Sequence, residues 1–87
     1  SVKNENLNSL SDISIYPNPT NNILNLKIAH QQIKEVKIFS LIGKQVFQSS
    51  AEIAAIEQIN ISQLSKGMYL IQLKTDVNTF TKKIIKN

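Results

Sequence analysis

Few side chains of this chain have the types and spacing that chemistry requires. A nucleophile with its base, a pair of carboxylates or a metal cluster must lie within hydrogen-bonding reach. The single histidine, His30, stands in the polar stretch Ala29-His30-Gln31-Gln32, which favours an exposed loop residue over a ligand or a base. The six acidic residues are scattered, at Glu5, Asp12, Glu35, Glu52, Glu57 and Asp76. This scatter predicts neither an acid/base pair nor a calcium loop.

Residue types and motifs that the sequence lacks exclude further kinds of site. The sequence has no cysteine, which removes disulfides and thiolate metal sites. It contains neither a phosphate-binding loop nor a dinucleotide fingerprint. Asp76 lies in Thr75-Asp76-Val77-Asn78, where the formation of a turn is its favoured role. We therefore predict that the chain is not an enzyme and needs no metal and no cofactor.

The positive charge of the chain comes from lysine alone. The formal net charge is +4, and all ten basic residues are lysines. Arginine, whose bidentate fork reads guanine edges and clamps phosphates, is absent. This composition permits contact with an anionic surface, but it argues against nucleic acid as a partner.

The apolar residues that must build the scaffold alternate with polar ones. The runs 24–28 and 69–73 are examples, and a period of two is typical of strands with one buried face. We predict seven strands, near residues 13–16, 22–29, 34–40, 45–50, 56–61, 67–74 and 78–86. Their starts lie about ten to twelve residues apart, which is typical of an all-β sandwich. The predicted fold is an immunoglobulin-like antiparallel β-sandwich of about seven strands.

One stretch competes for helix, and one turn is expected to be helical. Three alanines raise the helical propensity of residues 48–59, but the stretch lacks a sustained 3.6-residue repeat. We therefore predict a loop over 51–55. Residues 62–65 are expected to form a short helical turn that packs Leu64 under the sandwich.

A chain of 87 residues is long enough for one domain and too short for a second core. Residues 1–12 are polar and rich in asparagine and serine, so we expect a linker there and a domain over 13–87. No apolar run approaches the roughly 18 residues that cross a bilayer, so we do not expect a membrane-spanning segment. The first residues also lack the pattern of a signal peptide, so an address for export would have to lie elsewhere.

The five residues Tyr16-Pro17-Asn18-Pro19-Thr20 interrupt the strand pattern. Each proline lacks a backbone donor and fixes its own φ, and it pushes the preceding residue out of the helical region. A strand must therefore end here. The only other strong turn formers of this kind are the two glycines, Gly43 and Gly67.

These prolines and glycines are expected to meet at one end of the sandwich. If each strand reverses the direction of the one before it, the first, third and fifth turns share a pole. Those turns are 17–21, 41–44 and 62–67, which hold both prolines and both glycines. A seventh strand must then finish at the same pole with its lysines, while the linker leaves from the other end.

The last strand has two interpretations. Phe80, Lys82 and Ile84 point one way, and Thr81, Lys83 and Ile85 point the other, so neither face is cleanly apolar. The strand is either an edge that lysines protect from aggregation or a cationic handle, and both can hold. In the neighbouring run, Tyr69 alternates with apolar residues, which predicts a core aromatic whose hydroxyl has a partner.

Several motifs occur together in one order. They are the turn Tyr16-Pro17-Asn18-Pro19, the alternating run 23–28, the hairpin from Val36 to Val46, the spaced residues Leu64, Gly67 and Tyr69, and the basic end from Lys82 to Lys86. From about Ile13 to the last residue, this order resembles the type A C-terminal sorting domain of the type IX secretion system of Gram-negative bacteria. One departure is the turn Leu41-Ile42-Gly43-Lys44, where versions with aspartate, asparagine or threonine are expected.

The resemblance implies a C-terminal signal that directs a larger precursor across the outer membrane. The expected partners are the outer-membrane translocon with its shuttle components and the covalently attached upstream cargo. A sortase-like surface peptidase is expected to cut in or near residues 1–12. The protein would pass through the periplasm and end at the cell surface or outside the cell.

Two ways of docking remain open for such a signal. A receptor could meet the rigid turns and lysines of one pole, whose prolines and glycine lower the entropy lost on docking. Alternatively, it could add a strand beside the last strand. The candidate recognition residues are Tyr16, Pro17, Asn18, Pro19, Gly43, Lys44, Lys66, Gly67, Lys82, Lys83 and Lys86.

A rival function is an immunoglobulin-like binding or adhesion module that contacts carbohydrate or protein and is appended to a secreted enzyme. Sugar platforms usually need exposed aromatic side chains. The chain has no tryptophan, two tyrosines and three phenylalanines, and most of these lie where strands would bury them.

Overall fold

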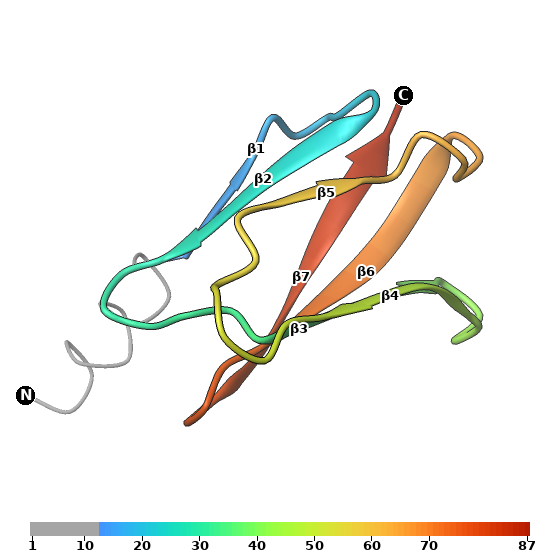
Figure 1. The fold of residues 1–87 in the computed structure, drawn as a ribbon. Coiled ribbons are helices and arrows are strands. Elements are labelled where there is room, and N and C mark those ends of the chain that lie inside the picture. The colour runs from blue at the N-terminus through green and yellow to red at the C-terminus, as the bar shows by residue number, and fades with distance from the viewer. Residues whose placement is uncertain (1–12) are drawn as a thin grey trace, which may run out of the picture.

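The computed structural model describes residues 13–87, which form two facing β-sheets (Figure 1). The strands are β1 Ile13–Tyr16, β2 Ile23–Ile28, β3 Glu35–Ser40, β4 Gln45–Ser50, β5 Gln58–Asn60, β6 Gly67–Lys74 and β7 Thr79–Lys86. There is no helix within this described part. The all-β sandwich and its seven strands are therefore confirmed. The predicted linker, residues 1–12, lies outside the described residues.

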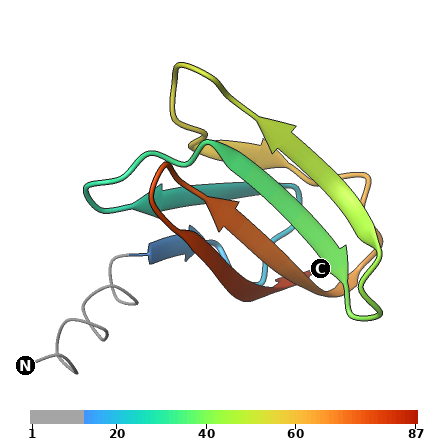
Figure 2. The same cartoon turned by 90° about the horizontal axis from the view of Figure 1, so that it is seen from below.

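The strands pair antiparallel in both sheets. One sheet has the order β1-β2-β5 and the other has the order β4-β3-β6-β7. In constant-type immunoglobulin domains the fourth strand belongs to the sheet of the first, second and fifth. Here β4 pairs with β3 instead, and Figure 2 shows the four strands of that sheet side by side. The immunoglobulin-like label stays a prediction.

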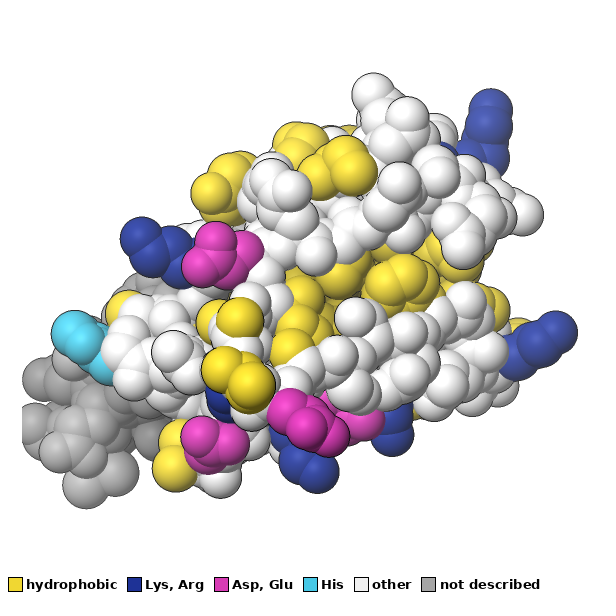
Figure 3. All heavy atoms as spheres, viewed as in Figure 1, with side chains coloured by type: hydrophobic (Ala, Val, Ile, Leu, Met, Phe, Trp, Pro, Cys, Tyr) yellow, Lys and Arg dark blue, Asp and Glu magenta, His cyan; other side chains and the backbone are white. Residues whose placement is uncertain are grey.

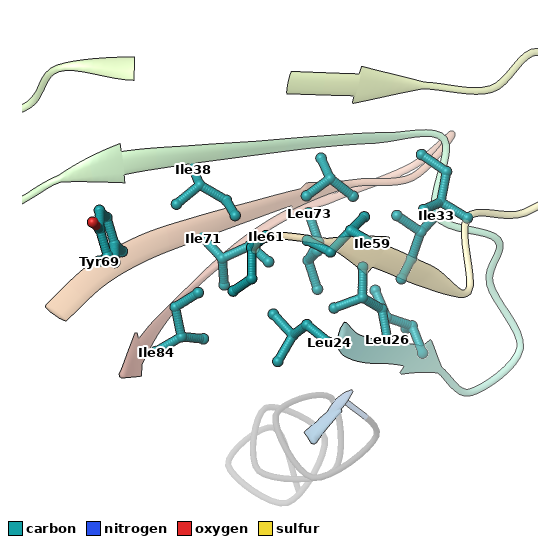
Figure 4. Close-up of a cluster of buried hydrophobic side chains, with 13 residues drawn as sticks. Leu24, Leu26, Ile33, Ile38, Ile59, Ile61, Tyr69, Ile71, Leu73 and Ile84 are labelled. Carbon is teal, nitrogen blue, oxygen red and sulfur yellow. The ribbon is translucent and has the colours of Figure 1, made fainter. Parts of the chain in front are cut away.

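The core lies between the sheets and follows the period-two alternation. Leu24 and Leu26 of β2 face Ile71 and its neighbours across the sandwich (Figure 4). The buried apolar residues are Leu24, Leu26, Ile28, Ile33, Val36, Ile38, Ile56, Ile59, Ile61, Tyr69, Ile71, Leu73 and Ile84. Burial of each large aliphatic side chain contributes about 1.5–3 kcal/mol. With no disulfide in the chain, this packing holds the sheets together.

The fifth strand is shorter than predicted, and one turn differs in type. β5 covers 58–60 instead of 56–61. The Leu26 N–H donates to the Glu57 carbonyl and the Ile61 N–H donates to the Asn22 carbonyl, so the register with β2 continues for one residue beyond each end of β5. Residues 62–65 form a turn with one bond between backbone groups, from the Leu64 N–H to the Ile61 carbonyl, and no helix. Leu64 packs against the core, as predicted.

The loop predicted over residues 51–55 is confirmed. Its ends are tied to the segment before β3, since Ala51 N–H donates to the Lys34 carbonyl at 2.9 Å and Ile56 N–H donates to the Ile33 carbonyl at 2.8 Å. These bonds satisfy the backbone without a helix. Residues 51–57 therefore cross from one sheet to the other as irregular chain.

Gly43 closes the hairpin between β3 and β4 in a left-handed conformation, with φ of 91°. Its N–H donates to the Ser40 carbonyl at 2.9 Å. A Cβ added at Gly43 would meet nothing within 4 Å, so only the backbone conformation disfavours other residues.

We expect Gly43→Ala to lower the free energy of unfolding by about 1–2 kcal/mol. Gly43→Asn should cost less, because asparagine tolerates this region. Denaturant unfolding of the two variants measures the difference.

Candidate functional site

The turns that hold the prolines and glycines lie at one end of the sandwich, here called the Pro/Gly pole (Figure 1). It consists of the segments 17–22, 41–44 and 61–66 and the end of β7. Within the four-stranded sheet, Ser40 at the end of β3 pairs with Tyr69, and Gly67 at the start of β6 pairs with Lys86. The ends of β3 and β7 and the start of β6 therefore lie at one pole, as the alternating strand directions predicted.

A clasp of hydrogen bonds joins the first turn to the last strand. The Thr20 N–H donates to the Ile85 carbonyl at 2.9 Å, and the Asn87 N–H donates to the Thr20 carbonyl at 2.8 Å. The side chain of Asn18 adds two contacts: its Oδ1 accepts from the Ile85 N–H at 3.0 Å, and its Nδ2 donates to the Lys83 carbonyl at 3.4 Å. The turn is thereby fixed to β7, which belongs to the other sheet.

Thr20 is the residue of this clasp that sequence reasoning missed. It is only 1% exposed, and its Oγ1 donates to the Ile23 carbonyl at 3.0 Å. Threonine is mostly exposed in proteins, so the sequence held no sign that it would be buried. Its partners on β7 lie at the far end of the chain, beyond the reach of local patterns.

The clasp limits strand addition at the edge of the sheet. β7 is an edge strand, as predicted. The clasp already uses the Lys83 carbonyl, both backbone groups of Ile85 and the N–H of Asn87. While it is closed, a partner strand could pair only with the residues of β7 before Lys83. This geometry favours docking at the turns over strand addition.

The lysines of the last strand do not all face outward. The inner face of β7 carries every second residue, namely Phe80, Lys82, Ile84 and Lys86. Lys83 projects outward. Lys86 is only 8% exposed, and its Nζ donates to the Asn87 carbonyl at 3.1 Å. The cationic handle is therefore smaller than the sequence suggested. An inward-pointing charge such as Lys82, which is half-buried, is one way in which edge strands avoid pairing with each other.

The other predicted pole residues are exposed. Pro17, Asn18 and Pro19 form the tip of the first turn, and both prolines follow cis peptide bonds. Tyr16 is 53% exposed at the end of β1, where its carbonyl accepts from Asn25 Nδ2 at 3.1 Å. Gly43, Lys44 and Lys66 are exposed in the other two turns, and Gly67 is exposed at the start of β6.

Tyr69 anchors the turn that precedes β6. It is 8% exposed, and its hydroxyl donates to the Ser65 carbonyl at 2.6 Å. The prediction of a core aromatic with a partner for its hydroxyl is confirmed. This bond fixes the backbone next to Lys66, so the lysine projects from a held turn.

Charge is divided between the two ends of the sandwich. All four acidic residues of the described part lie at or near the opposite pole, in or beside the segments 29–35, 51–57 and 75–78. The Pro/Gly pole carries Lys44 and Lys66 in its turns, Lys83 nearby and the buried Lys86. On the face in Figure 3, the right-hand end shows dark blue side chains and no magenta. This pole is therefore cationic.

One histidine and four acidic residues among residues 13–87 are the candidates that the sequence offered for metal or acid/base chemistry. His30 is exposed in a loop, as predicted, with φ of 65°. No group of three histidine or acidic residues in this part could hold a metal ion. A hollow of about 680 Å³ lies beside β2 and the 55–58 segment, and its charged lining residues are only Lys27 and Glu57. No helix in the described part is long and apolar enough to cross a membrane.

Comparison with known protein families identifies the domain that contains the Pro/Gly pole. Residues 14–87 match the family described as secretion system C-terminal sorting domain. The chain belongs to this family. The sorting domain spans both sheets, so the match includes the clasp, the turns of the Pro/Gly pole and the last strand. Domains of this type IX secretion family mark proteins that are exported to the cell surface or the extracellular space.

The sorting domain is also similar to parts of two longer proteins. It is 27% identical over 79 residues to ulvan lyase NLR42 of Nonlabens ulvanivorans, covering 90% of this chain and 15% of that protein. It is 32% identical over 83 residues to the endo-acting ulvan lyase of Formosa agariphila, covering 93% of this chain and 16% of that protein. The chain thus spans about a sixth of the length of these relatives.

Proposed function

We propose that the type IX machinery recognises this sorting domain as a folded body, through the Pro/Gly pole. The observation that carries the proposal is the clasp, which joins a turn near the start of the domain to its last strand. Candidate residues from the first, third and fifth turns become neighbours only when both sheets have formed. A receptor that contacts several of them at once would distinguish a folded domain from an unfolded one.

The remaining steps of the pathway belong to the same proposal. A cargo joined upstream enters the outer-membrane translocon with the domain, and a sortase-like peptidase then cuts in or near residues 1–12. The first described strand, β1, begins at the opposite pole, because Ile13 pairs with Ile28 at the end of β2. A tether that starts there leaves the Pro/Gly pole free for a receptor. The two relatives, both ulvan lyases, support a lyase as the class of cargo.

Three variants of the domain, fused behind a periplasmic reporter, test this proposal by export to the medium of a type IX-competent bacterium. They are Pro17→Ala/Pro19→Ala, Tyr16→Ala and Lys83→Glu, which change exposed residues at or beside the pole. We expect each to reduce export by about tenfold or more, as loss of a central contact does. Circular dichroism checks that each variant folds. Normal export by all three folded variants contradicts recognition through the pole.

The rival function as a carbohydrate-binding module has little support in the structure. Four of the five aromatic residues, all within the described part, are buried or half-buried, and Tyr16 alone is exposed. One ring does not make a platform for a sugar chain. A glycan-array titration with clear affinity would favour this rival.

A further inference from the structure

The outer face of the four-stranded sheet has an apolar half and a polar half. Toward the Pro/Gly pole, Phe39 of β3 lies opposite Leu70 of β6, and Met68 of β6 lies opposite Ile85 of β7. Toward the opposite pole, the paired residues are polar or charged, such as Lys37 with Gln72 and Glu35 with Lys74. A sheet face that only meets water carries polar residues along its whole length. The half near the Pro/Gly pole is therefore an apolar surface that no other strand of the described part covers.

The turn between β3 and β4 extends this apolar half. Leu41 follows the last residue of β3 and is 60% exposed, and Ile42 at the tip of the turn is 89% exposed. Met68 and Ile85 are exposed as well, at 41% and 39%. We call these two turn residues and the four sheet residues the apolar patch: Phe39, Leu41, Ile42, Met68, Leu70 and Ile85. Contiguous apolar surface of this kind marks interaction sites on soluble proteins.

The charged side chains that border the apolar patch in the described part are lysines. Lys83 lies opposite Leu70 on the same face, Lys44 follows the β3–β4 turn, and Lys66 precedes β6. The acidic side chains of the described part lie at or near the opposite pole. A second copy of this chain would bring the same lysines against each other, which disfavours self-association. A partner with carboxylates around an apolar ridge would complement both the apolar patch and the lysines at its border.

We propose that the apolar patch docks onto a protein surface that has an apolar ridge flanked by acidic side chains. This inference rests on the proposed function, since it names the chemistry of the receptor that the Pro/Gly pole meets. A protein surface fits better than a lipid surface, because the patch combines a protruding turn with the pleated face behind it. A bilayer could embed the turn tip, but it would not cover Phe39 and Leu70 in the sheet.

Export of the reporter fusion tests the apolar centre. We expect Ile42→Ser/Met68→Ser to lower export by about tenfold or more, as loss of a central apolar contact does. The matched control is Ile53→Ser/Val77→Ser, which changes two exposed apolar residues at the opposite pole, 89% and 73% exposed, and should export normally. All four positions are solvent-exposed, so thermal unfolding should stay near that of the unchanged domain.

A charge series tests the acidic nature of the partner. Lys44→Glu/Lys66→Glu/Lys83→Glu should lower export by about tenfold or more, whereas arginine at the same three positions keeps the charge and should keep export. Lys27→Glu/Lys74→Glu, near the opposite pole, is the matched control. Equal export by the glutamate and arginine series would overturn the charge complementarity.

The outcomes separate this inference from the function on which it rests. If the intact domain exports the reporter and the folded patch variants do so equally well, the docking surface is wrong and the sorting function stands. If the intact domain fails to export the reporter, both are wrong. Sedimentation of the isolated chain with vesicles of equal parts phosphatidylcholine and phosphatidylglycerol should show no binding. Binding that Ile42→Ser/Met68→Ser abolishes would replace the protein partner with a membrane.

Discussion

Ile84→Ala is expected to lower the free energy of unfolding by about 2–5 kcal/mol, the range for large-to-alanine changes in a core. Ile84 is fully buried, and it pairs with Tyr69 across β6 and β7. Loss of its side chain leaves a cavity between the last strand and the opposite sheet. For a domain of this size, the change should lower the midpoint of thermal unfolding by at least about 8 °C.

Ile85→Ala is the matched control for this prediction. It removes the same atoms from the next residue, but Ile85 faces outward and is 39% exposed. We expect its effect on the free energy of unfolding to stay within about 1 kcal/mol. Equal destabilisation by the two variants would mean that the alternation of β7 differs from the structure.

Opening the clasp is the second large change. Asn18→Ala removes the acceptor of the Ile85 N–H, and Thr20→Val removes the hydroxyl that donates to the Ile23 carbonyl. Each change should cost about 1–2 kcal/mol, so we expect the double variant to lose about 2–4 kcal/mol. Hydrogen exchange of the Ile85 amide should become faster than that of the neighbouring strand residues. Denaturant unfolding and amide exchange measure the two effects.

Asn22→Ala controls for loss of an asparagine from the same turn. The Asn22 side chain is exposed, and no hydrogen bond of that side chain appears in the described part of the chain. It should leave both stability and the Ile85 amide unchanged. An unaltered Ile85 exchange rate in the double variant would show that the Asn18 side chain does not hold the last strand.

Alternation and strand parity were sufficient to predict most of this fold. Buried residues such as Leu26 and Ile71 alternate with polar neighbours, and the local pattern survives in the sandwich because one face of each strand meets the core. Parity then placed the ends of β3 and β7 at one pole without knowledge of the sheet order. The shorter span of β5 was not predictable, because its bounds depend on its pairing with β2, a strand distant in the sequence.

The candidate site was less predictable, because it depends on contacts between distant residues. Asn18 bonds to β7 across 65 and 67 residues of sequence, and no local pattern encodes such a pair. The inward direction of Lys86 and the burial of Thr20 also depend on how the two sheets meet. The apolar patch emerges only from strand register, since Phe39, Leu70 and Ile85 lie on three strands.

The most direct test of the account compares export with folding in a graded core series. The domain carries Ile84→Val, Ile84→Ala or Ile71→Ala behind the same reporter, and thermal unfolding gives the folded fraction of each variant at the growth temperature. Immunoblots of a secretion-deficient strain check that the fusion accumulates in the periplasm. We predict that export falls in step with the folded fraction, although every surface residue of the Pro/Gly pole is present. Full export by a variant that is unfolded at the growth temperature would contradict recognition of a folded domain.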